Sequence, residues 1–143
     1  MLKNSINTAF LHYNRAKKNH NEIDIDNLNS KVFLDDNKIK TIDAFIYRFI
    51  KLQDFMGDKL FKDLLTSLGE YKDNMSLLDV LDKLEKLEII KSADQWFSFR
   101  AIRNKMTHEY PDNEQDVIAG LILAIDAFNI MEEILLSVKK YCR

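Results

Sequence analysis

The residues best suited to chemistry lie between Arg100 and Tyr110, immediately before Pro111, the one proline of the chain. At 100° per residue, the apolar side chains of this stretch share one side of a helix: Phe99, Ile102 and Met106. The polar ones lie on the other side: Arg100, Asn104, Thr107 and His108, with Arg103 at the edge. Proline removes a donor and disfavours the α conformation before it, so the helix is predicted to end near His108 or Glu109.

Apolar residues recur at steps of three and four along most of the chain, which predicts long helices around this stretch. Helices are expected over residues 2–18, 38–68, 76–90, 92–108 and from 112 toward the C-terminus. Ser76 is a predicted helix cap, and two capping boxes are predicted, one by Ser92 with Gln95 and one by Asp112 with Gln115. Gly69 is the predicted end of the second helix. Residues 19–37, rich in Asn and Asp, are predicted to form a connection.

The last helix has a seam of the kind found in helix bundles: Val117, Leu121, Ala124, Phe128, Met131, Leu135 and Val138. A second apolar face lies over its first half: Ile118, Ile122 and Ile125. With three glycines and one proline in 143 residues, the chain has too few turn-forming residues for a fold of many strands. The predicted architecture is therefore an all-α, up-and-down bundle of about five helices, in one domain spanning residues 1–143.

The second helix carries an unusually wide apolar surface. Its stripe contains Ile42, Phe45, Ile46, Phe49, Met56, Leu60 and Leu64, and Leu52 and Phe55 widen it. A surface of this width predicts burial against two neighbouring helices, or against one helix and a second subunit, and we expect a two-fold homodimer. Gly57 is interpreted as a bend or a close helix contact, two alternatives that the pattern leaves open.

Composition limits the classes of function. The net charge of −2, with basic and acidic residues mixed, argues against a broad nucleic-acid surface, although a small site with a few arginines remains compatible. Cys142 is the single cysteine, which excludes an internal disulfide or a cysteine metal site and indicates a reducing, cytoplasmic setting. The polar first twenty residues do not resemble a signal peptide, and no apolar run has the length of a membrane span.

The stretch Arg103-Asn104-Lys105-Met106-Thr107-His108-Glu109-Tyr110 has the form R-N-x-x-x-H-x-Y. It resembles the signature of HEPN-domain proteins, and the tyrosine two places after the histidine is similar to the HepT-type toxins. This resemblance implies a metal-independent endoribonuclease toxin that works as a homodimer without a cofactor. It also implies a partner, a minimal nucleotidyltransferase antitoxin that would neutralise the toxin by AMPylation of Tyr110.

The residue types suit that reaction. Arg103 offers a planar donor fork for a phosphate in its transition state, and His108 titrates near neutral pH and can act as base or acid. Asn104 lies one turn before His108 and could orient its ring or hold a phosphate oxygen. Because one chain supplies one motif histidine and the reaction needs two proton-handling groups, a two-fold dimer would complete the site. Arg103, Asn104 and His108 are thus the candidate catalytic residues, with no metal.

Other interpretations stay open for several residues. Arg100 and Arg48 are candidates for RNA binding, although a plain surface position fits Arg100 at least as well. Arg48 and Gln53 could line a cleft from the second helix, but interior hydrogen bonding or a subunit contact is preferred for both. Tyr110 can instead pack beside Pro111. Three further groups are expected to have no part in catalysis. His12 and His20 are expected to be solvated, and so are the Asp24/Asp26 and Asp35-Asp36 pairs, which lack the spacing of a calcium-binding loop. Trp96, Phe97 and Phe99 are expected to lie in the core.

Two functions compete with the toxin. One is a HEPN-like subunit that binds substrate for a nucleotidyltransferase without catalysis. The other is an inert helical dimerisation domain. RNA cleavage would distinguish the toxin from the binding subunit. A phenotype caused by substitution of the motif residues would distinguish both of these from the inert domain.

Overall fold

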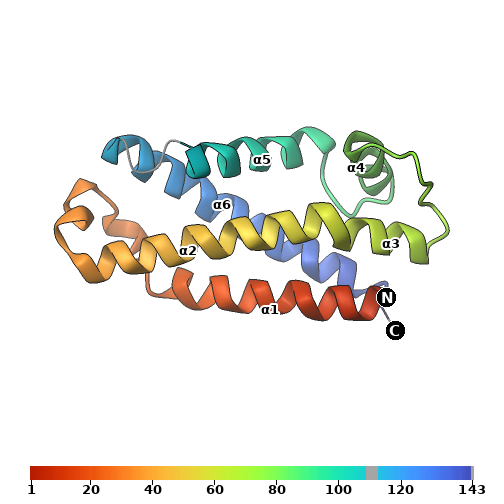
Figure 1. The fold of residues 1–143 in the computed structure, drawn as a ribbon, viewed down its shortest axis with the longest axis horizontal. Coiled ribbons are helices and arrows are strands. Elements are labelled where there is room, and N and C mark those ends of the chain that lie inside the picture. The colour runs from red at the N-terminus through yellow and green to blue at the C-terminus, as the bar shows by residue number, and fades with distance from the viewer. Residues whose placement is uncertain (109–112, 143) are drawn as a thin grey trace.

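The long helices run back and forth along the molecule, the last of them crosses obliquely behind the others, and a short helix lies at one end (Figure 1). The computed structural model describes residues 1–108 and 113–142, and for His108 the helix but not the side chain. The helices are α1 (Leu2–Asn21), α2 (Asp36–Phe55), α3 (Phe61–Ser67), α4 (Leu77–Lys86), α5 (Ala93–His108) and α6 (Glu114–Lys139). Since α2 and α3 are continuous, these make five helices, and the described residues include no strand. The prediction of an all-α bundle of five helices is confirmed.

A single π-helical turn, η3 (Met56–Leu60), joins α2 to α3. It is centred near Gly57, and a Cβ atom added to Gly57 would stand 3.5 Å from Nε1 of Trp96 on α5. Gly57 thus faces α5 at ordinary contact distance, as one interpretation of this glycine expects, and the bend stays a prediction. A π turn inserts a residue into the helix and changes which side chains face a neighbour, and such turns are frequent at functional sites.

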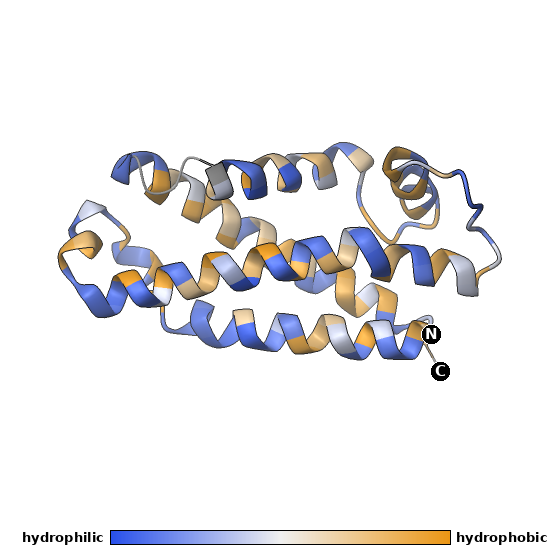
Figure 2. Cartoon of the chain, viewed as in Figure 1, coloured by the Kyte–Doolittle hydropathy of each residue, from blue (hydrophilic) through white to orange (hydrophobic). Residues whose placement is uncertain are grey.

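The wide apolar surface of the second helix is covered by the chain itself. Its stripe residues are buried, and so is Leu52, at 0% exposure. Phe55 is half-buried and packs against His12 of α1, with ring centroids 5.6 Å apart. Figure 2 shows that apolar residues recur along each long helix, as helices surrounded by neighbours require. The apolar area from which a second subunit was inferred is therefore accounted for within one chain, and that argument for a dimer was wrong.

The seam of α6 is buried along its whole length, from Val117 to Val138, as predicted. Its second face is buried only in part, because Ile125 is 3% exposed and Ile122 is 42% exposed. Met106 of α5 packs against Gly120 of α6, where the methyl end of the methionine occupies the space that a Cβ atom would need. This contact fixes how closely the motif helix approaches the last helix.

Side chains define the helix ends largely as the sequence predicts. Ser76 and Asp79 form a reciprocal capping box, and the hydroxyl of Ser92 accepts a hydrogen bond from the backbone N–H of Gln95. Gly69 has φ +73° and ends α3. The cap predicted at Asp112 is wrong: the residue that caps α6 is Asn113, whose side chain accepts from the N–H of Asp116.

The predicted connection over residues 19–37 is shorter than expected, since α1 extends to Asn21 and α2 begins at Asp36. Between them lie two short 3₁₀ helices, η1 (Ile25–Asn27) and η2 (Ser30–Leu34). Val32 packs back into the core, and Asp35 accepts backbone hydrogen bonds at the start of α2. None of the helices in the described ranges is long and apolar enough to span a membrane.

The prediction that His12 and His20 are solvated was wrong. Both side chains are partly buried on α1, and the ring of His20 lies against Phe45 and Phe128, with centroids 5.9 and 5.4 Å away. Burial lowers the pKa of both imidazoles, and the neighbouring cations Arg15 (for His12) and Lys17 (for His20) lower it further. Burial of an ionisable ring disfavours its charged form, so the neutral form of both histidines is favoured relative to a solvated histidine.

Candidate functional site

The motif helix α5 has the two faces that its sequence predicts. Phe99 and Met106 are each 4% exposed, and Ile102 is half-buried against the core. On the opposite side, Arg100 and Asn104 are exposed, and Arg103 is intermediate. The apolar residues fix the helix against the bundle, and the polar residues are presented to solvent as one group.

Arg103 is paired with a carboxylate that the sequence analysis did not identify. Its Nε lies 3.1 Å from Oδ1 of Asp54 and its Nη2 lies 2.9 Å from Oδ2, which is a bidentate pair between α5 and α2. The hydrogen bonds to Asp54 raise the pKa of Arg103; burial opposes this shift, and the negative charges of Asp54 and Asp58 add to it. Asp54 is 49 residues from Arg103 in the chain. The one sequence feature that could have suggested it as a site residue is its position next to Gln53 on the second helix.

The pair with Asp54 uses one edge of the guanidinium. Asp54 occupies the Nε and Nη2 edge, whereas Nη1 is oriented toward its own helix, 3.5 Å from Oδ1 of Asn104 and 3.4 Å from Oγ1 of Thr107. These two contacts are long for hydrogen bonds and are therefore weak. The Nη1 and Nη2 edge can consequently exchange them for two oxygens of a second oxyanion, such as a phosphate.

A cavity of about 280 Å³ opens between α2 and α5 beside this pair. Its wall contains Gln53, Asp54, Gly57 and Asp58 from α2 and the π turn, Trp96, Arg100, Arg103 and Asn104 from α5, and Leu77 from α4. The side-chain Nε2 of Gln53 donates a 2.8 Å hydrogen bond to the backbone oxygen of Phe99, one turn before Arg103. This buried bond fixes α2 against α5 at the cavity.

The charges around the cavity balance. Arg100 and Arg103 contribute two positive charges, and Asp54 and Asp58 contribute two negative ones. Attraction of a polyanion by the overall field is therefore small here, and an anion would be held by short-range hydrogen bonds to individual arginines. The arrangement suits a local phosphate contact rather than a broad nucleic-acid surface.

The remaining predicted site residues are distributed as follows. Arg100 and Asn104 line the cavity with Arg103. Arg48 does not line it, and its guanidinium instead lies over the ring of Tyr47, 5.2 Å from the centroid. Trp96 and Phe99 are buried, as predicted for core residues. The side chain of His108 and the whole of Tyr110 lie outside the described residues.

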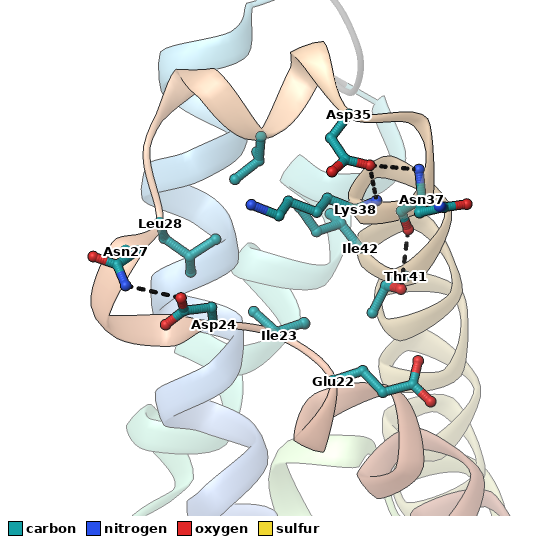
Figure 3. A pocket seen from close by; sticks show the side chains of 11 residues that line it. Glu22, Ile23, Asp24, Asn27, Leu28, Asp35, Asn37, Lys38, Thr41 and Ile42 are labelled. Atoms are coloured by element: carbon teal, nitrogen blue, oxygen red, sulfur yellow. Dashed lines mark hydrogen bonds between the residues drawn. The ribbon is translucent and has the colours of Figure 1, made fainter.

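A second cavity, of about 320 Å³, lies at the start of α2 beside η1 and η2 (Figure 3). Its carboxylates serve the local backbone and side chains: Asp35 accepts from the N–H groups of Asn37 and Lys38, and Asp24 accepts from Asn27. Asp35 and Asp54 are separated by 19 positions of α2, roughly 28 Å of helix, so this cavity is separate from the motif. Within the described ranges, no three His, Cys, Asp or Glu side chains are grouped so that they could hold a metal ion.

None of the known family models, curated proteins or solved structures compared with this chain matches it. The resemblance to HEPN-domain proteins therefore depends on the motif between Arg103 and Tyr110, and the function below is argued from the residues of the site.

Proposed function

We propose that this chain is a metal-independent endoribonuclease toxin of the HepT type, active in the cytoplasm and neutralised by a partner nucleotidyltransferase. The observation that carries the proposal is Arg103, which Asp54 holds in a bidentate pair so that its outer edge and Asn104 lie together on the polar face. His108 follows on the same helix, at the spacing of the motif. An oriented arginine and a histidine on one helix provide the two functions needed to cleave RNA without a metal: charge stabilisation and proton transfer.

The reaction proposed is attack of an RNA 2′-OH on the adjacent phosphorus. A base takes the 2′-OH proton, the 2′-oxygen forms a bond to phosphorus, and the bond from phosphorus to the 5′-oxygen breaks as that oxygen accepts a proton. The products are a 2′,3′-cyclic phosphate and a 5′-OH. Arg103 stabilises the charge that develops on the phosphoryl oxygens, and His108 transfers a proton.

A homodimer would provide the second proton-transfer group, because two motifs facing each other across a two-fold axis give two histidines. Tyr110, two residues after His108, is the proposed target of AMPylation by the antitoxin. An adenylyl group there would add bulk and negative charge two residues from His108 in the sequence, and we expect this to oppose RNA binding.

The test compares Arg103→Ala and His108→Ala with the parent protein. Loss of the proton-transfer group is expected to lower RNA cleavage about 10²–10⁴-fold, and loss of the arginine about 10²–10³-fold. Growth arrest on expression should disappear in both variants, while melting curves change little. Folded variants that remain as toxic as the parent would reject the ribonuclease.

The absence of a metal requirement is tested in the same assay. Cleavage should persist in EDTA and leave a 2′,3′-cyclic phosphate end, because the proposed steps use side-chain acid, base and charge alone. Activity that is abolished by the chelator and restored by magnesium contradicts this mechanism.

Asp54→Asn tests the positioning of Arg103 separately. The amide keeps the shape of the carboxylate but loses its charge and one of its two acceptor oxygens, so Arg103 should be held less firmly. Cleavage should fall by about tenfold or more, with most of the loss in kcat, and the change should be absent in an Arg103→Ala background. Asp58→Asn, on the same cavity wall, is the matched control.

A second candidate function is supported by the cavity itself. A recess lined by Trp96, Gln53 and Arg103 is also what a subunit needs to bind a nucleotide without cleaving RNA. Purified protein that binds nucleotides and leaves every RNA intact would favour this alternative.

A further inference from the structure

Two nearly buried polar side chains form part of the wall of the cavity beside Arg103. Gln53 is 3% exposed and Trp96 is 1% exposed. The amide nitrogen of Gln53 is engaged with the Phe99 oxygen, whereas its carbonyl oxygen has no hydrogen-bond donor in the described part of the chain. Nε1 of Trp96 likewise has no acceptor among these residues, and it lies on the side of the indole that faces Gly57, another residue of the cavity wall.

Although the two residues are almost buried, neither of these atoms is sealed within the protein, so both are accessible to a ligand that enters the cavity. The glycine between them leaves the approach to the indole nitrogen open, since a larger residue would place a Cβ atom 3.5 Å from it. The cavity thus offers one acceptor and one donor in its wall, about 280 Å³ of space, and a guanidinium at its rim. That volume lies at the lower limit of small-molecule sites and suits one flat ring system rather than an extended ligand.

We propose that this cavity holds one unstacked nucleobase, with the adjoining phosphate at Arg103. Every nucleobase carries a hydrogen-bond donor next to an acceptor on its pairing edge, and these can meet the Gln53 oxygen and the Trp96 N–H together. Sequence-specific proteins read unpaired RNA in this way, by splaying a base out and hydrogen-bonding its edge. The inference rests on the proposed function for the identity of the substrate, and it adds the contacts that would hold a base beside the bound phosphate.

The charge balance of the rim supports a base as the main source of affinity. With Arg100 and Arg103 offset by Asp54 and Asp58, a phosphate alone gains little from the local field. A ligand that also satisfies the two buried groups gains two hydrogen bonds that a bare phosphate cannot make. Two such bonds should together raise the affinity roughly tenfold or more, and a factor of ten corresponds to about 1.4 kcal/mol.

The experiment uses the indole N–H of Trp96, which gives one signal in a proton–nitrogen NMR spectrum because the chain has one tryptophan. The full chain is titrated with the four nucleoside 5′-monophosphates and, separately, with ribose 5-phosphate. At least one nucleotide should bind about tenfold or more tighter than ribose 5-phosphate and should shift the indole signal. Equal affinities, or an indole signal that no nucleotide moves, would overturn the proposal.

Two variants assign the contacts. Gln53→Met should remove most of the preference for nucleotide over ribose 5-phosphate, and Gln115→Met, the same change at an exposed position on α6, should leave it intact. Because Gln53 is buried, Gly57→Ala provides an independent measurement: its methyl group meets the indole at ordinary contact distance and narrows the cavity without removing any packing. An unchanged preference in folded Gly57→Ala and in Gln53→Met would reject a base in this cavity.

Cleavage assays separate this proposal from the proposed function. Cleavage of RNA with no base-dependent binding at Trp96 rejects the base site and keeps the ribonuclease. Base-dependent binding without cleavage of any RNA rejects the ribonuclease and keeps the base site. If the protein both cleaves RNA and binds a base in this cavity, Gly57→Ala should change the relative cleavage rates of oligonucleotides that differ in one base.

Discussion

At the scale of single residues, the pair between Arg103 and Asp54 orients the arginine more than it stabilises the fold. Their side chains are 27% and 40% exposed, and ion pairs at such positions contribute about 1 kcal/mol or less. The bidentate geometry nevertheless fixes the plane of the guanidinium, because two parallel hydrogen bonds leave it little rotational freedom. Substitutions of this pair are therefore expected to affect activity far more than melting temperature.

Met106 is expected to behave in the opposite way. Because it is 4% exposed and packs against Gly120, Met106→Ala should cost about 2–5 kcal/mol of unfolding free energy. The effect of Gly120→Ala on the unfolding free energy should be more favourable by about 1 kcal/mol or more in the Met106→Ala background than in the parent. The reason is that the added methyl group then fills the space that the methionine side chain occupied. Denaturant unfolding of the four proteins measures this coupling, and additive effects would show that the contact is absent.

His20 makes the stability of the fold depend on pH. Its pKa in the folded chain is lowered by burial and by Lys17, whereas Asn21 and Glu132 oppose the shift. The folded state therefore binds fewer protons than the unfolded state in the range just below the usual histidine pKa of about 6.5. Stability should be full above about pH 6.5 and should fall as the pH decreases through the lower folded pKa.

His20→Phe tests this dependence. The phenyl ring can keep the contacts with Phe45 and Phe128 and cannot take up a proton, so the loss of stability between pH 6.5 and 5 should become smaller. His12, whose pKa is also lowered, should retain part of the slope. Denaturant midpoints across this pH range give the comparison, and an identical slope in parent and variant would show that His20 is not the group responsible.

At the scale of elements, the helix ends are formed by specific side chains, with one unusual position after α4. Glu88 has φ 60°, in the left-handed region that favours glycine. Its N–H donates to the oxygen of Glu85 at 3.0 Å, and the N–H of Ile89 donates to that of Leu84 at 2.9 Å, which is the Schellman pattern. A residue with a Cβ atom is strained in this conformation.

Glu88→Gly should therefore raise stability by up to about 1 kcal/mol, as the relief of strain exceeds the entropy that glycine adds to the unfolded chain. Glu88→Ala is the matched control, since it removes the carboxylate but keeps the Cβ atom, and it should give no gain. Thermal melting distinguishes the two, and equal gains in both variants would assign the effect to the charge instead.

At the scale of the whole molecule, the chain forms a complete core without help. The second helix is covered by α1, α5 and α6, and its central residues are fully buried in one subunit. Oligomerisation is therefore not needed to protect apolar surface, and the proposed dimer has to be explained by function: each subunit supplies one copy of the motif. Exposed apolar residues outside the core are available for such contact on α6, among them Ile122, Leu123 and Leu136.

We expect a homodimer at micromolar concentration, because the proposed reaction requires two motifs. Sedimentation should show a species of about twice the 16.8 kDa of the chain. Mixing His108→Ala with Arg103→Ala protein should restore part of the cleavage, since a heterodimer can combine one intact histidine with one intact arginine. A single species near 16.8 kDa at all concentrations, with active protein, would remove the composite site.

The sequence alone determined the helices, because local rules decide them. The period of apolar residues located the long helices, Gly69 and Ser76 marked ends that depend on a few neighbouring backbone groups, and the two faces of α5 followed from angular spacing. Where local signals were nearly equivalent, the prediction failed by one residue: Asn113, and not Asp112, is the residue that caps α6.

Only the tertiary structure decided which residues of different helices meet. The spacing of apolar residues places Asp54 on the polar side of its helix, but it does not predict that Asp54 pairs with Arg103. That pairing depends on the register between α2 and α5, which is set by the π turn and by the approach of α5 at Gly57. The same reason explains His20, which lies off the apolar stripe of α1 yet is enclosed by aromatic rings from α2 and α6. Contacts between distant segments depend on packing, and packing is not contained in the spacing of any one helix.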